Sequence, residues 1–124
     1  MTPEELRART KRFAIGVVRL YQVLPRTEEA RTLGRQVLRS GTSVAANYRA
    51  ACLARSKAEF IARVGIVLEE ADETIFWLEL LEETGVLGKG QGKGLHGEAV
   101  ELARIFGASL RTARASRNNR PLAR

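Results

Sequence analysis

The stretch that decides the fold runs from Leu33 to Leu81 and reads LGRQVLRSGTSVAANYRAACLARSKAEFIARVGIVLEEADETIFWLELL. Its apolar residues recur every three or four positions, which is the period of an amphipathic helix. Ser56 and Glu59 fit a capping box, so one helix ends near Ala54 and the next begins at Lys57. So short a connection predicts that these two helices are antiparallel neighbours.

Helical signals also flank this stretch. Thr2, Pro3 and Glu5 combine an N-cap hydroxyl, a proline at the first helical position and a glutamate at the third. Pro25 ends that helix, and Thr27 caps the next. The sequence therefore predicts a single all-α domain over residues 1–118, an antiparallel up-down-up-down four-helix bundle. Its helices are expected at about 3–24, 27–54, 57–84 and 95–116, with a glycine-rich connector at 85–97 and a flexible tail at 119–124.

The helix expected at 57–84 is apolar over more than one face. A single small bundle has little room for a fully buried helix, so the second apolar face predicts contact with another subunit. We expect a homo-oligomer whose interface includes Phe76, Trp77 and Leu80.

Charge is segregated along the chain, which carries a net charge of +7. Residues 64–88 hold seven acids and no Lys or Arg, whereas bases cluster at 7–12 and again from 104 to 124. Such segregation indicates either phosphate binding or basic helices packed beside an acidic one. A second alternative is that the C-terminal arginines only complement a helix dipole and aid solubility. The residues expected to contact nucleic acid are Lys11, Arg12, Arg104, Arg111, Arg114, Arg117 and Arg120.

A polar stripe follows one face of the helix at 27–54. Antiparallel packing about the Arg55-Ser56 turn predicts that Arg39 lies beside Asp72, with Glu69 and Glu73 close by. A paired charge between helices more often fixes geometry than performs chemistry, so a structural role is expected. The predicted network comprises Gln36, Arg39, Ser43, Asn47, Glu69, Asp72 and Glu73.

Motifs for catalysis are weak. Residues 92–97 match G-x-G-x-x-G, but no strand precedes them, as a dinucleotide site requires. Glu69, Glu70 and Glu73 lack the Glu-x-x-His partners of di-iron bundles, since His96 is the single histidine and falls in the connector. Cys52, the single cysteine, suits a small buried hydrophobe. We expect no catalytic residues, metal or cofactor; an enzyme that completes a carboxylate site across subunits is the remaining alternative.

The N-terminus is acidic and polar, unlike a signal peptide, and no window approaches the roughly 18 apolar residues of a membrane span. These features predict a cytoplasmic protein without a membrane partner.

The chain resembles the four-helix-bundle proteins of the 23S rRNA intervening-sequence family over about residues 13–87. The likeness rests on Gln36-x-x-Arg39, residues 43–47 (SVAAN), residues 55–60 (RSKAEF) and Glu73. It departs from the family pattern at Ala50-Ala51 and at Glu69-Glu70, where Glu-Gly and Gly-Ser are usual. The resemblance implies a bacterial cytoplasmic bundle assembled as a ring, commonly a homopentamer, with RNA or ribonucleoprotein contact and no enzymatic activity.

From these observations we expect a non-enzymatic oligomer that binds structured RNA through basic residues. The alternative is a protein-binding adaptor or assembly scaffold whose arginines meet acidic partner surfaces.

Overall fold

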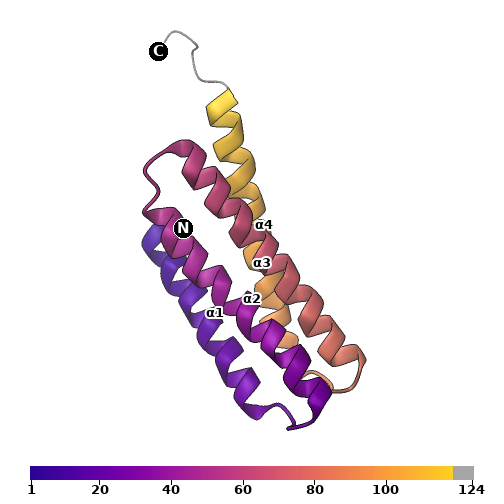
Figure 1. Cartoon of the computed structure of the whole chain (residues 1–124). Coiled ribbons are helices and arrows are strands. Elements are labelled where there is room, and N and C mark those ends of the chain that lie inside the picture. The colour runs from indigo at the N-terminus through magenta and orange to yellow at the C-terminus, as the bar shows by residue number, and fades with distance from the viewer. Residues whose placement is uncertain (119–124) are drawn as a thin grey trace.

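The computed structural model describes residues 1–118, with side chains to Ser116. It contains the helices α1 (Pro3–Val23), α2 (Glu28–Cys52), α3 (Lys57–Glu83) and α4 (Lys93–Asn118). Helix α1 packs on α2, α2 on α3, α3 on α4, and α4 again on α1, so α1 and α3 lie at diagonal corners (Figure 1). The all-α up-down bundle is confirmed. The predicted tail at 119–124, with Arg120, lies outside the described residues.

The helices begin where the capping residues predict. The Thr2 side chain accepts a hydrogen bond from the Glu5 amide (3.1 Å), and the Glu5 carboxylate accepts one from the Thr2 amide (3.2 Å). This backbone bond lowers the pKa of Glu5. Thr27 likewise accepts from the amide three residues further on, at 3.3 Å. Each cap satisfies an amide that the first helical turn leaves without a partner.

The start of α3 is capped differently from the prediction. Ser56 accepts from the Glu59 amide (3.0 Å), but the Glu59 carboxylate accepts from the Arg55 amide (3.3 Å). In a capping box the Glu59 carboxylate would accept from the Ser56 amide, but here the donor is the amide one residue earlier. This second bond ties the α2–α3 turn to α3.

Side chains from all four helices form one core. Helices α1 and α2 pack closely at Gly41, where a Cβ atom would lie 2.7 Å from Cγ2 of Val17. Ser40 and Thr74 are the buried polar residues between α2 and α3. The largest fully buried apolar side chains are Val17, Val37, Val44, Val64, Val67, Leu78, Leu81, Leu102 and Phe106.

The connector is shorter than expected because α4 begins at Lys93. Gly85 and Gly90 have φ of 80° and 81°, and these left-handed residues turn the chain at the end of the bundle. His96 therefore lies on α4, where a ring nitrogen is 2.9 Å from Oε2 of Glu79, and its predicted place in a flexible connector is wrong. Burial of Ala99 one turn later helps to hold the glycine-rich segment helical against its low propensity.

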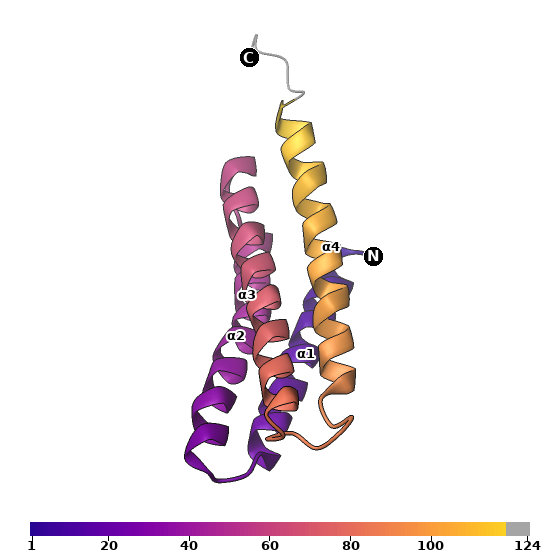
Figure 2. The same cartoon turned by 90° about the vertical axis from the view of Figure 1, so that its right-hand side faces the viewer.

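Contact between α1 and α4 is the sparsest in the bundle, and α4 projects beyond the neighbouring end of α3 (Figure 2). Arg9 clamps the two helices by donating from Nε and Nη2 to the two carboxylate oxygens of Glu98, each at 2.7 Å. This bond raises the pKa of Arg9. Across residues 1–118, no helix combines the length and apolar character that crossing a membrane requires.

Candidate nucleic-acid interface

A basic groove opens between α1 and α2, with a volume of about 550 Å³. Its cations come from both helices: two stand one turn apart on α1, and the third lies near the end of α2. The small side chains between them leave room for a ligand to approach the helices closely. The residues lining this α1–α2 groove are Arg7, Ala8, Lys11, Thr42, Ala45, Ala46 and Arg49.

The cations of the groove are largely uncompensated. Arg7 lies 3.7 Å from Glu4, an exposed pair of little strength. Within residues 1–116, Lys11 and Arg49 make no ion pair. The pKa of Arg7 is raised, chiefly by the neighbouring Cys52 thiol and less by Glu4. The groove therefore concentrates positive charge at a concave surface, which favours anions.

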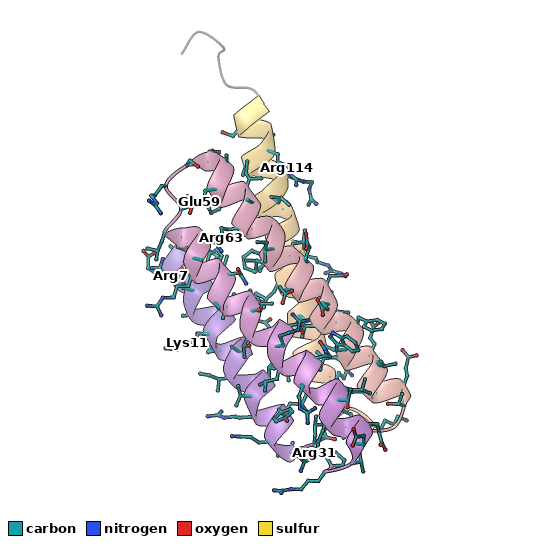
Figure 3. All side chains as sticks on the ribbon, viewed as in Figure 1. Arg7, Lys11, Arg31, Glu59, Arg63 and Arg114 are labelled. Carbon is teal, nitrogen blue, oxygen red and sulfur yellow. The ribbon has the colours of Figure 1, made fainter. Side chains whose placement is uncertain are left out.

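Positive charge continues along the same helix pair. Arg26 and Arg31 line a second pocket, of about 320 Å³, at the opposite end of α1 and α2. Figure 3 shows Arg7 and Lys11 at one end of this face and Arg31 at the other. The sequence signal for this face is the absence of acids from residues 6–27 and 30–58, which together hold twelve bases. This signal is weak in the sequence because the bases of α2 are spread singly along the helix and form no cluster.

The bases predicted to contact nucleic acid lie on different helices. Lys11 lies in the α1–α2 groove and Arg12 is exposed on α1. Between α1 and α4 stands Glu98, bound to Arg9. The antiparallel register of that pair sets Pro3 level with Arg104, so α4 runs past the end of α1 from there.

The predicted arginines of α4 therefore stand apart from the groove. Arg104, Arg111 and Arg114 are exposed on α4, and Arg104 is 3.8 Å from Glu101. Arg117 belongs to the last turn of α4, and its side chain, like the whole of Arg120, lies outside the described part of the chain.

Comparison with known proteins places the chain in a family. The family of 23S rRNA-intervening sequence proteins matches residues 5–108. The chain belongs to this family. A crystal structure of a protein of unknown function from the S23 ribosomal protein family of Bacteroides thetaiotaomicron VPI-5482 has the same fold, with a TM-score of 0.82 and 33% identity. The match covers 90% of this chain and 99% of that one. No curated protein matches.

In this member of the family, the residues that carry the resemblance include part of the α2–α3 contact. Arg39 donates to Glu70 (3.1 Å) and to Glu73, and its Nε donates to the side-chain oxygen of Gln36 (3.3 Å). Glu73 also accepts from the indole of Trp77, at 3.1 Å. The predicted pairing of Arg39 with Glu73 is therefore found.

The rest of the predicted network differs. Glu69 and Asp72 are exposed and do not bond to Arg39; Glu70 takes that place. One residue along a helix rotates a side chain by about 100°, so a small error in register selects the wrong acid. Asn47 donates to the backbone oxygen of Ser43 (3.0 Å), a bond within α2 rather than between helices.

The three residues predicted at a subunit interface occupy the outer part of α3. Phe76 is 52% exposed, whereas Trp77 and Leu80 are half-buried. The rings of Phe76 and Trp77 meet edge to face, with centroids 4.9 Å apart. The excess apolar surface predicted for this helix is therefore present. That a second subunit covers it stays a prediction.

Proposed function

We propose that this protein binds structured RNA, without catalysing a reaction, by seating phosphates in the α1–α2 groove. The observation that carries the proposal is the convergence of Arg7, Lys11 and Arg49 around one concavity, with Glu4 the nearest ion-pair partner. Arginine and lysine are the side chains that proteins use most for phosphate oxygens. The family name, which refers to a sequence within 23S rRNA, agrees with an RNA ligand.

The chemistry of the groove favours the backbone of RNA over its bases. No aromatic side chain lines the groove, so the stacking that holds single-stranded bases is missing there. The floor is made of alanines on two rigid helices, which suits recognition of a shape presented by a folded strand. Affinity is then expected to come from charge and to fall as salt rises.

The test is a titration of the purified protein against 23S rRNA fragments, mixed RNA and duplex DNA at two salt concentrations. The wild type is compared with a groove variant, Arg7→Gln/Lys11→Gln/Arg49→Gln. We expect preference for RNA, weaker binding by the variant, and a salt slope shallower by about 0.7–0.9 per lost phosphate contact.

The matched control removes three charges from α4 through Arg104→Gln, Arg111→Gln and Arg114→Gln. All three side chains are exposed and lie outside the groove. If this variant loses as much affinity as the groove variant, net charge rather than the groove determines binding. If the wild type binds no RNA even at low salt, the proposal fails, and a protein-binding adaptor becomes the better explanation.

A further inference from the structure

The α1–α2 groove contains one side chain that can accept a hydrogen bond. Of the seven residues that line it, three are cations, which only donate, and three are alanines without a polar side-chain atom. The seventh is Thr42, whose hydroxyl oxygen carries two lone pairs. A ligand seated in the groove therefore meets donors at Arg7, Lys11 and Arg49 and an acceptor at Thr42.

The Thr42 hydroxyl can meet a ligand as an acceptor because its proton is already used. It donates that proton within α2, to the backbone oxygen of Leu38 at 2.7 Å, and the backbone oxygen of Arg39 lies at 3.2 Å. A threonine hydroxyl has one proton and two lone pairs, so the oxygen can still accept a bond. The side chain is half-buried, and a molecule in the groove can reach it.

The acceptor and the cations lie at different levels of the groove. The close approach of Gly41 to Val17 fixes the antiparallel register of α2 on α1. In this register Arg49 lies level with the turn of α1 that carries its two groove cations. Thr42 lies roughly 7 Å beyond Lys11 along the helix axis. A strand lying along the groove can therefore place a phosphate against the cations and a neighbouring sugar against the hydroxyl.

Only one of the two nucleic-acid backbones offers a donor to this acceptor. Phosphate oxygens accept hydrogen bonds and do not donate them, and deoxyribose within a strand has no hydroxyl. Ribose carries a 2′-hydroxyl, a donor and acceptor that lets proteins tell RNA from DNA. A DNA strand in the groove would displace water from the Thr42 oxygen and return no donor, which weakens binding.

We propose that Thr42 gives the groove a preference for RNA over DNA by accepting a hydrogen bond from a ribose 2′-hydroxyl. The inference rests on the proposed function, because it takes the groove as the place where a nucleic-acid backbone lies. The cations cannot make this distinction, since their charges attract the phosphates of RNA and DNA alike. Affinity then comes from the cations, and discrimination comes from the hydroxyl.

The test compares one 23S rRNA hairpin fragment with its 2′-fluoro analogue of the same sequence. Fluorine at the 2′ position keeps the A-form shape of the RNA but has no proton to donate. We expect the wild type to bind the RNA about three- to tenfold more tightly than the analogue, as one hydrogen bond between neutral groups would give. In Thr42→Val, which keeps the shape and lacks the oxygen, the two ligands should bind equally.

Two further variants serve as controls. Thr42→Ser retains the oxygen and should keep the wild-type ratio of the two dissociation constants. Thr84→Val should keep it as well. Thr84 donates to the backbone oxygen four residues earlier at 2.7 Å, as Thr42 does, but it is exposed at the end of α3 and lies outside the groove. Circular dichroism checks that each variant folds.

Three results would overturn the inference, and they are distinguishable from one another. If the wild type binds the RNA and the 2′-fluoro analogue equally, RNA binding stands but Thr42 does not recognise the 2′-hydroxyl. If Thr42→Val weakens binding of both ligands by the same factor, the threonine only shapes the groove. If the wild type binds neither ligand even at low salt, the proposed function itself fails and the inference fails with it.

Discussion

The hydroxyl of Thr74 lies 2.9 Å from that of Ser40, and both side chains are fully buried between α2 and α3. Ser40 donates to the backbone oxygen of Gln36 (2.8 Å), and Thr74 lies 2.7 Å from that of Glu70. Because Ser40 spends its proton within α2, the single Thr74 proton is shared between the Ser40 oxygen, which joins the two helices, and the Glu70 carbonyl within α3. The link locates one register of α2 on α3 without leaving a buried polar atom unsatisfied.

Replacing Thr74 with valine keeps the shape and removes the link. We expect a loss of about 1 kcal/mol of unfolding free energy, because Ser40 retains its bond to Gln36 and is not left without a partner. Urea unfolding measures the change. A cycle with Ser40→Ala separates the link from the single hydroxyls: if the two losses simply add, the hydroxyls do not interact.

Loss of the Arg39 guanidinium should lower the stability of the fold only slightly, and by an amount that depends on salt. Arg39 bonds Glu70 and Glu73, but its side chain is 47% exposed, so solvent screens the attraction. We expect Arg39→Met to lower the unfolding free energy by at most about 1 kcal/mol, and by less at high salt. Thermal melts at two salt concentrations check this. An unchanged melting temperature at low salt would show that Arg39 serves only as a solvated surface charge.

Gly41 should not tolerate even one methyl group. Its Cβ would lie 2.7 Å from Val17 Cγ2 at a buried contact of α1 with α2, so Gly41→Ala is expected to cost about 1–3 kcal/mol. Gly65 is the matched control: it is also helical, and a Cβ there meets nothing within 4 Å. Gly65→Ala should therefore stabilise the protein by about 0.5–1 kcal/mol through helix propensity. Equal effects at the two sites would rule out the close approach as the cause.

The Arg9–Glu98 pair should control how firmly α4 stays on α1. Both side chains are partly buried, at 22% and 30% exposure, and their bonds span the sparsest contact of the bundle. We expect Glu98→Gln to cost about 1 kcal/mol. Hydrogen exchange should quicken in α1 and the first half of α4, while α2 and α3 keep their protection. Faster exchange spread evenly over all four helices would argue against a local clamp.

Ionisation of Tyr48 should lower the unfolding free energy at high pH. Burial, followed by the neighbouring Cys52, raises its pKa to about 12 from 10.0. The folded protein therefore holds the phenol proton more tightly than the unfolded chain does, and stability is fully present below pH 10 and falls between pH 10 and about 12. In Tyr48→Phe the ring can still pack on Phe106, since the two ring centroids of the wild type are 5.2 Å apart. The variant has no phenol proton to lose, so the loss of stability that Tyr48 causes above pH 10 should vanish. Denaturant midpoints of both proteins at pH 9 and 11 check this; parallel decreases would contradict it.

Much of the fold could be predicted because helix signals are local. The caps at Thr2, Thr27 and Ser56 mark three helix starts within a residue of those observed. The start of α4 was less clear, since glycines at 94 and 97 weaken the local signal and burial of Ala99 is a tertiary effect. The family could be inferred as well, because its motifs are short stretches of α2 and α3.

The candidate site was predicted only in part. Lys11 was identified from a cluster of bases, but Arg7 and Arg49 lie more than forty positions apart in the sequence and meet only when α1 and α2 pack. The acids of α3 show the same limit. The sequence predicted Asp72 beside Arg39, with Glu69 and Glu73 close by, whereas the structure pairs Arg39 with Glu70 and Glu73.

The sequence by itself determined that the chain forms four amphipathic helices, where three of them begin, and that α3 carries acids and surplus apolar side chains. The tertiary structure alone decided which bases share a groove, which acid meets Arg39, and which faces stay uncovered. The physical reason is that periodicity and capping depend on residues within a turn or two, whereas the rotation and register of one helix on another depend on packing along its whole length.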